Sequence, residues 1–226
     1  MKRKHFLQKS LLGIGGIIGL NSLSGCDKNT TNPSNPNCPT MPTEIAGPFP
    51  IKSPSDWVRA NIIGNRSGVA LMINFTILNV NDDCKPLPNV FVDLWQCDSK
   101  GNYSEYDQQL DGDFTSDHFL RGRQTTDANG NVSFISIYPG WYPGRAPHLH
   151  VEVKNATGNS LLITQIAFPE NISTNVYTAQ GYNGNFDTTN ASDGSFSDTL
   201  DENMVDSITG DLQNGYTAQK TIRVEG

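Results

Sequence analysis

The chain has 226 residues, of which 36% are hydrophobic and 17% are charged, and its formal net charge is −7. This length is sufficient for a domain with a sizeable core, and the 21 glycines and 13 prolines argue against a helical bundle. The negative charge argues against nucleic-acid binding, because a phosphate backbone attracts cationic surfaces.

The first 25 residues have the pattern of a secretory leader. The basic stretch MKRKHFLQKS precedes the apolar run LLGIGGIIGL, which is too short to span a membrane. Leu23-Ser24-Gly25-Cys26 resembles a lipobox, which implies cleavage before Cys26 and a lipid on its sulfur; an ordinary signal peptide with an incidental cysteine is the alternative. We therefore expect an extracytoplasmic, membrane-anchored lipoprotein, in the periplasm or on the cell surface. Loss of the leader's four basic residues would change the charge from −7 to −11.

Residues 26–43 are expected to form a lipidated tether, since this stretch has many chain breakers and no apolar periodicity. Residues 3–8 also resemble a twin-arginine export motif in which lysine replaces one arginine. Both that route and the general secretory route therefore stay open. The folded domain is expected over residues 44–226.

Three cysteines follow the lipobox, namely Cys38, Cys84 and Cys97. Outside the cytoplasm, one disulfide with one thiol left over is expected. The sequence does not give the pairing. Cys38 is favoured as one partner, because a disulfide there would pin an otherwise loose N-terminal segment.

The domain shows one strand pattern after another. Strand-like runs occur at 70–80, 90–97, 125–138, 148–153, 159–168 and 216–226. The turn Asp127-Ala128-Asn129-Gly130 is typical of a hairpin, and no stretch after the leader has a convincing helical period. The sequence therefore predicts an all-β sandwich. Its long connecting loops, at 99–124 and 169–211, are expected to carry function.

A candidate metal chelate lies in the alternating run HLHVEV. His148 and His150 are two residues apart, so they share one face of the expected strand. Two histidines on a solvated face are the alternative. Tyr142 offers a hard oxygen donor, and a phenol with a resting pKa near ~10 is ionised only by a strongly acidic cation such as ferric iron. The donors alone leave iron, copper and zinc open, and a zinc site would draw on a carboxylate such as Glu152.

The segment RAPHLH, together with PGWY before it and LWQCDSKGNYS earlier, resembles the intradiol ring-cleavage dioxygenases, in their secreted single-domain branch. The segments GPFP, FLRGRQTTDANG, LLITQ, TTNASDGSFSD and GYTAQKTI extend the resemblance over roughly residues 38–224. It implies Fe(III) held by two tyrosines and two histidines. These ligands are Tyr103, Tyr142, His148 and His150.

The resemblance also implies the activity, which is aromatic compound catabolism by a dioxygenase. A catechol-type ring is cleaved between its two hydroxylated carbons, and both atoms of O2 enter a muconate-type diacid. Tyr142 would leave the iron when substrate binds, while Tyr103 stays. Arg145 would stabilise charge on the ring, and Gln165 would orient groups by hydrogen bonding. A surface ion pair for Arg145 and a solvent-facing Gln165 are the alternatives.

Only Pro143 and Gly144 separate the second tyrosine from Arg145, where the cytoplasmic catechol enzymes have a long loop. We therefore expect an open site, which lignin-derived catechols, plant catechols and hydroxyquinol could all enter. Two other functions stay open. One is a copper protein on the same donors. The other is a binding lipoprotein without catalysis, using exposed aromatics such as Trp57, Tyr177 and Tyr182.

Overall fold

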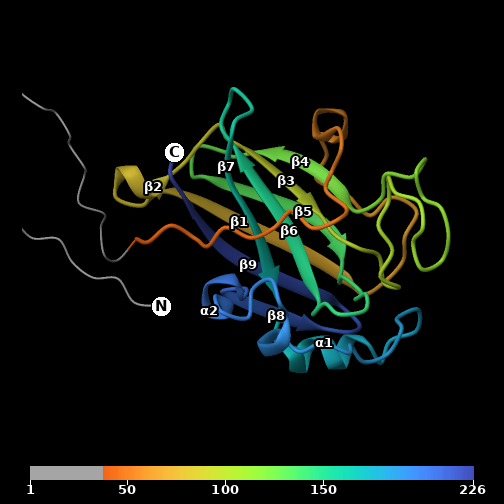
Figure 1. Ribbon diagram of the computed structural model, residues 1–226. Coiled ribbons are helices and arrows are strands. Elements are labelled where there is room, and N and C mark those ends of the chain that lie inside the picture. Colours follow the sequence, from red (N-terminus) through yellow and green to blue (C-terminus); the bar gives the residue numbers. More distant parts are fainter. Residues whose placement is uncertain (1–37) are drawn as a thin grey trace, which may run out of the picture. The chain divides into compact units, whose positions relative to one another are not determined.

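The computed structural model describes residues 38–226. The expected leader, the lipid site at Cys26 and the tether up to residue 37 lie outside the described residues. The described part consists mainly of strands in two sheets, with few helices (Figure 1), which confirms the predicted all-β sandwich. Among residues 38–226, no helix has the length and apolar character needed to cross a membrane.

The five-stranded sheet contains β1 (Ala70–Asn79), β2 (Lys85–Pro86), β5 (Asn131–Ile137), β8 (Ser207–Asp211) and β9 (Gly215–Val224). The four-stranded sheet has the order β4 (Arg121–Thr125), β3 (Phe91–Trp95), β6 (His148–Lys154) and β7 (Ser160–Ala167). The helices are α1 (Glu170–Val176) and α2 (Leu200–Asn203), and the 3-10 turns are η1 (Pro54–Trp57), η2 (Val80–Asp82) and η3 (Asn190–Ser192). Neighbouring strands are antiparallel except β1 and β9, which are parallel.

Each strand-like run of the sequence contains a strand, but the expected loops are more ordered than predicted. The range 169–211 holds α1, η3, α2 and β8, which lie along the lower side of Figure 1. The helix α1 has only seven residues, two of them buried, so it is too short to show a period. The strand β4 has the sequence RGRQT and contains no apolar residue. Such a polar strand can be buried because its arginines pair with buried acids, as Arg123 does with Asp93 at 2.6 Å.

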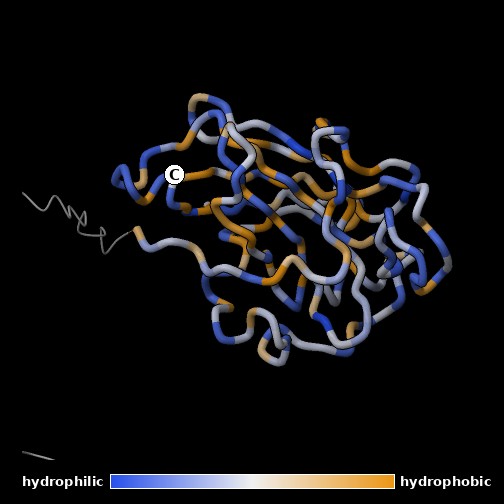
Figure 2. The backbone as a smooth tube through the Cα atoms, turned by 45° about the horizontal axis from the view of Figure 1, so that its top comes forward, coloured by the Kyte–Doolittle hydropathy of each residue, from blue (hydrophilic) through white to orange (hydrophobic). Residues whose placement is uncertain are grey.

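The core forms where alternating strands turn their apolar side chains inward. Along β1, Ile73 and Phe75 are buried, whereas Asn74 and Thr76 face outward. Burial of each such apolar side chain contributes about 1.5–3 kcal/mol. Apolar stretches accordingly run through the body of the tube in Figure 2, and the peripheral loops are mainly hydrophilic.

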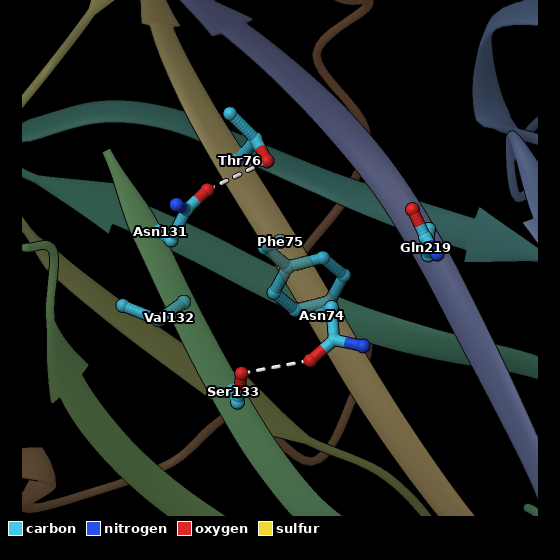
Figure 3. A pocket seen from close by; sticks show the side chains of 7 residues that line it. All are labelled: Asn74, Phe75, Thr76, Asn131, Val132, Ser133 and Gln219. Atoms are coloured by element: carbon cyan, nitrogen blue, oxygen red, sulfur yellow. Dashed lines mark hydrogen bonds between the residues drawn. The ribbon is translucent and has the colours of Figure 1, made fainter. Parts of the chain in front are cut away.

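Part of the outer face of the five-stranded sheet is polar (Figure 3). The Thr76 hydroxyl donates to Asn131 Oδ1 at 2.9 Å, and the Ser133 hydroxyl donates to Asn74 Oδ1 at 2.7 Å. These side chains and Gln219 line a shallow hollow. Its lining contains none of the expected metal ligands.

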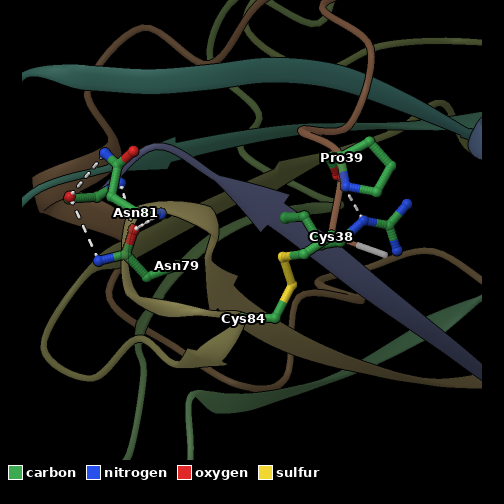
Figure 4. Close-up of a disulfide and its surroundings, with 7 residues drawn as sticks. Cys38, Pro39, Asn79, Asn81 and Cys84 are labelled. Atoms are coloured by element: carbon green, nitrogen blue, oxygen red, sulfur yellow. Dashed lines mark hydrogen bonds between the residues drawn. A yellow bond between two sulfur atoms is a disulfide. The ribbon is translucent and has the colours of Figure 1, made fainter. Parts of the chain in front are cut away.

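An extended segment, residues 38–50, runs beside the edge strand β7, and we call it the N-terminal strap. The backbone N–H of Glu44 donates to Ile163 O at 2.8 Å, and the Thr164 hydroxyl donates to Pro42 O at 2.9 Å. A disulfide joins Cys38 at its start to Cys84 (Figure 4), so the favoured partner is confirmed. Cys97 is the buried free thiol.

Candidate metal centre

The two histidines at the start of β6 face each other on one side of the strand. Both are buried, and their Nε2 atoms are 3.0 Å apart. Two nitrogens at about 2.1 Å from one metal ion, in perpendicular directions, would be about 3 Å apart. The observed separation of the two Nε2 atoms is therefore the one that two adjacent ligands of a single ion would have.

Tyr103 comes from the turn that follows β3. Asp98 shapes this turn, since its Oδ1 accepts from the backbone N–H of Lys100 and of Asn102, each at 2.9 Å. Gly101 has φ +91°, and a Cβ there would lie 2.3 Å from the backbone oxygen of Trp141. The two tyrosine-bearing turns therefore pack directly against each other.

The four expected ligands converge. The ring centroids of Tyr103 and Tyr142 are 5.8 Å apart, and those of Tyr142 and His148 are 5.7 Å apart. His150 lies 4.7 Å from His148 and 6.1 Å from Tyr103 by the same measure. Side chains from two loops and one strand therefore surround a common point.

Burial keeps all four donors uncharged when no metal is bound. It raises the pKa of Tyr103 well above its ordinary value and also raises that of Tyr142, where Arg145 partly opposes the effect. Burial lowers the pKa of His148 to about 3, and it lowers that of His150 well below its ordinary value. The imidazoles are thus in the neutral form that binds metals.

These residues fit a metal ion. The Tyr103 hydroxyl is buried and has no hydrogen-bond partner within residues 38–226, and leaving a buried polar atom unpaired costs free energy. The same part of the chain contains no cluster of three or more His, Cys, Asp or Glu side chains able to hold a metal. Glu152, the carboxylate considered for zinc, pairs instead with Lys154 at 3.0 Å. A metal ion held by the two histidines would therefore draw on the nearby phenol oxygens.

The strap and β3 enclose His150. The Trp95 ring stacks on the imidazole with centroids 5.1 Å apart and an interplanar angle of 1°. Gly47 has φ +70°, and a Cβ there would lie 2.9 Å from His150 Cε1. Phe49 lies 5.0 Å from Tyr103 between ring centroids. The GPFP motif thus reaches the centre because its glycine lets the backbone approach a ligand.

Arg145 and Gln165 lie beside the ligands, as expected. Arg145 donates from Nη1 to the Tyr142 hydroxyl at 3.2 Å and from Nη2 to Gln165 Oε1. Gln165 is fully buried, so it does not face solvent, and its Nε2 donates to Ile45 O at 2.8 Å. Arg145 does pair with a carboxylate, but that carboxylate, Asp193, is buried and not on the surface.

The sequence analysis missed two buried residues that hold the parts of this site together. Asp193 lies in the polar segment TTNASDGSFSD, and its place in that segment was the only available signal. Arg121, at the start of β4, is fully buried and donates to Ser104 O at 2.6 Å and to Phe49 O at 3.0 Å. It therefore joins the residue after Tyr103 to the strap. Its position within the FLRGRQ motif was the only available signal.

The aromatic residues considered for a binding module do not form an exposed platform. The expectation is wrong for Tyr177, which is 4% exposed and whose hydroxyl donates to Pro139 O. Trp57 and Tyr182 are half-buried, and the Tyr182 hydroxyl donates to Tyr138 O. These side chains stabilise the fold.

Comparison with known proteins agrees with this geometry. The family model described as Dioxygenase matches residues 48–179, which is more than half of the chain. An intradiol ring-cleavage dioxygenase from Tetranychus urticae is similar in structure, with a TM-score of 0.73 and 30% identity, over 83% of this chain and 95% of that chain.

Two curated relatives are similar in sequence. The protocatechuate 3,4-dioxygenase beta chain of Burkholderia cepacia is 31% identical over 116 residues, 48% of this chain and 49% of its own. Hydroxyquinol 1,2-dioxygenase of Rhizobium sp. is 28% identical over 145 residues, 56% of this chain and 47% of its own. The chain thus spans about half the length of these relatives. The match over residues 48–179 and the shared sandwich show that the chain belongs to the intradiol ring-cleavage dioxygenase family.

Proposed function

We propose that this chain is a non-haem Fe(III) dioxygenase that cleaves a catechol-type ring between its two hydroxylated carbons. Both atoms of O2 would enter the muconate-type diacid product. The observation that supports this best is the convergence of two phenols and two imidazoles, with the histidine Nε2 atoms 3.0 Å apart.

Tyr103, Tyr142, His148 and His150 would hold the iron. Two hard phenolate oxygens favour ferric iron over softer ions. When bound, the ferric ion would lower the pKa of the substrate diol and let the ring react with O2.

The two tyrosines differ in burial, which supports different roles for them. Tyr103 is fully buried, and Phe49 packs on its ring. Tyr142 is half-buried and lies next to the exposed residues Pro143 and Gly144. We therefore assign Tyr142 as the ligand that yields to substrate. Because burial raises its pKa, its oxygen would readily accept a proton from the diol.

Arg145 would act on the substrate itself. Its guanidinium lies 3.2 Å from the Tyr142 hydroxyl, so it would adjoin a ring that takes the place of Tyr142. A permanently charged group there would stabilise negative charge as it develops on the ring. Gln165 would hold the guanidinium and the strap together, through Arg145 and Ile45 O.

We also propose that the chain works outside the cytoplasm, anchored by a lipid on Cys26. The leader pattern and the lipobox-like residues 23–26 support this location. The disulfide between Cys38 and Cys84 is in keeping with an oxidising compartment.

The test is oxygen uptake by the iron-loaded chain with catechol, protocatechuate and hydroxyquinol, together with the ultraviolet spectra of the products. At least one substrate should consume O2 and give a diacid spectrum. Tyr103→Phe and His150→Ala should abolish turnover. Tyr138→Phe is the matched control, since Tyr138 is equally buried but donates to or accepts from Ser173 outside the site. Iron-loaded protein that consumes no O2 with any catechol would overturn the proposal.

A further inference from the structure

A buried carboxylate from the C-terminal loop adjoins the metal centre. Asp193 follows η3 and is 0% exposed. Its oxygens accept from Arg145 Nε at 2.8 and 3.1 Å, from the backbone N–H of Ala146 at 2.8 Å and from that of Ser195 at 2.9 Å. The carboxylate is therefore fully satisfied, and two of its partners belong to the turn that carries the ligands.

Through Arg145, Asp193 fixes the direction of the guanidinium. The guanidinium is planar, so holding the Nε edge determines where both terminal nitrogens lie. These nitrogens donate to Tyr142 and Gln165. Within residues 38–226, Arg145 Nε has no hydrogen-bond partner other than Asp193, so without that carboxylate the guanidinium would not be held beside Tyr142.

Through Ala146, Asp193 reaches the first histidine. Ala146 donates its N–H to Asp193, and its carbonyl oxygen accepts from His148 Nδ1 at 2.6 Å. Metal-binding histidines are commonly oriented by a hydrogen bond at the nitrogen that does not face the metal. Asp193 thus holds the peptide that orients His148.

The same loop touches the ligand-bearing turn at further points. Trp141 Nε1 donates to Gly184 O at 2.9 Å, and Gly144 N donates to Asp187 Oδ1 at 3.2 Å. The Phe196 ring lies 6.3 Å from that of His148. Contacts from this loop therefore hold the short connection through Pro143 and Gly144 in place.

We propose that Asp193 is a positioning residue for ring cleavage, acting through Arg145 and the Ala146 peptide. This inference rests on the proposed function. Removal of one member of a buried, hydrogen-bonded charge pair leaves the other charge uncompensated. Loss of the Asp193 charge should therefore displace Arg145 and loosen the Ala146 peptide that orients His148.

The test is a double-mutant cycle with Asp193→Asn, Arg145→Gln and the double variant, measured on the iron-loaded full chain. We expect Asp193→Asn to lower kcat by about 10- to 100-fold, with a smaller change in KM. In the Arg145→Gln background the further loss of kcat should be clearly smaller, because the guanidinium is one of the two groups through which Asp193 acts and it is already absent. The matched control is Asp201→Asn, an exposed aspartate of the same 169–211 range, which should leave kcat unchanged.

Two readouts do not depend on turnover. Iron release to a chelator should be faster in Asp193→Asn, since His148 is less well oriented. The visible tyrosinate band should shift, since Tyr142 loses its guanidinium partner, and this shift should be absent when Arg145 is already glutamine. Should Asp193→Asn not fold, Asp193→Ser can still accept from Ala146 and takes its place in the cycle.

Equal losses of kcat in both backgrounds, or no loss in either, would overturn the role of Asp193 while the wild type stays active. A wild type inactive on all catechols would instead overturn the proposed function, and this inference with it. The two failures are therefore distinguishable.

Discussion

Replacing Gly47 by alanine tests how closely the strap shapes the metal centre. At φ +70°, the new Cβ would lie 2.9 Å from Cε1 and 3.3 Å from Nε2 of His150. The imidazole is also stacked against Trp95, with centroids 5.1 Å apart. Either the strap or the ligand ring must therefore move by several tenths of an ångström.

The size of the effect follows from comparison with a second glycine. Gly158 has φ +89°, but a Cβ there would meet nothing within 4 Å. Both alanine variants should lose roughly 1–2 kcal/mol of stability for the left-handed backbone. Only Gly47→Ala should also disturb His150. A change in a residue that orients a metal ligand lowers the metal affinity about 10- to 100-fold, which corresponds to about 1.4–2.8 kcal/mol.

Two measurements separate these contributions. Denaturant unfolding of the metal-free proteins gives the backbone cost alone in Gly158→Ala, and the backbone cost plus the steric cost at His150 in Gly47→Ala. Competition with a chelator of known affinity gives the metal affinity, which should fall in Gly47→Ala alone. If Gly47→Ala binds iron as tightly as Gly158→Ala, the strap does not position His150.

Two further predictions concern stability. The disulfide closes a separation of 46 residues, so replacing Cys38 and Cys84 by serine should lower the free energy of unfolding by about 4 kcal/mol; a loss below about 1 kcal/mol in denaturant unfolding would contradict this. Burial lowers the pKa of His148 to about 3 and also lowers that of His150, whereas both take up protons near ~6.5 once unfolded. The unfolded chain then binds more protons, so the metal-free protein should lose up to about 1.4 kcal/mol per pH unit per histidine as the pH falls below about 6.5. Equal unfolding midpoints at about pH 6.5 and about pH 5 would argue against buried, neutral imidazoles.

Local patterns carried the prediction of the strands and of the histidine pair. Alternation along β6 places His148 and His150 on one face, because successive strand residues point to opposite sides. The strand β4 was not predicted, because it has no apolar alternation. Its arginines are stabilised by partners distant in the sequence, such as Asp93 for Arg123. The pairing of Cys38 with Cys84 also depends on the folded chain.

The rest of the site depends on contacts between residues far apart in the sequence. Tyr103 lies in a turn without a period and far from the histidines in the sequence, so only the family resemblance indicated that it meets them, whereas Tyr142 is near them in the sequence. Asp193 is 48 residues from Arg145, and nothing in its neighbourhood marks it as buried. Gly47 is positioned against His150 by the strap, whose course along β7 is a tertiary feature.

The visible absorption spectrum of the iron-loaded protein tests the central claim most directly. The account predicts one iron per chain and a red-brown colour from charge transfer between tyrosinate and ferric iron. Tyr103→Phe and Tyr142→Phe should each weaken the band, and Tyr138→Phe should leave it intact. A colourless protein that retains zinc or copper, or a band unchanged in both ligand variants, would contradict it.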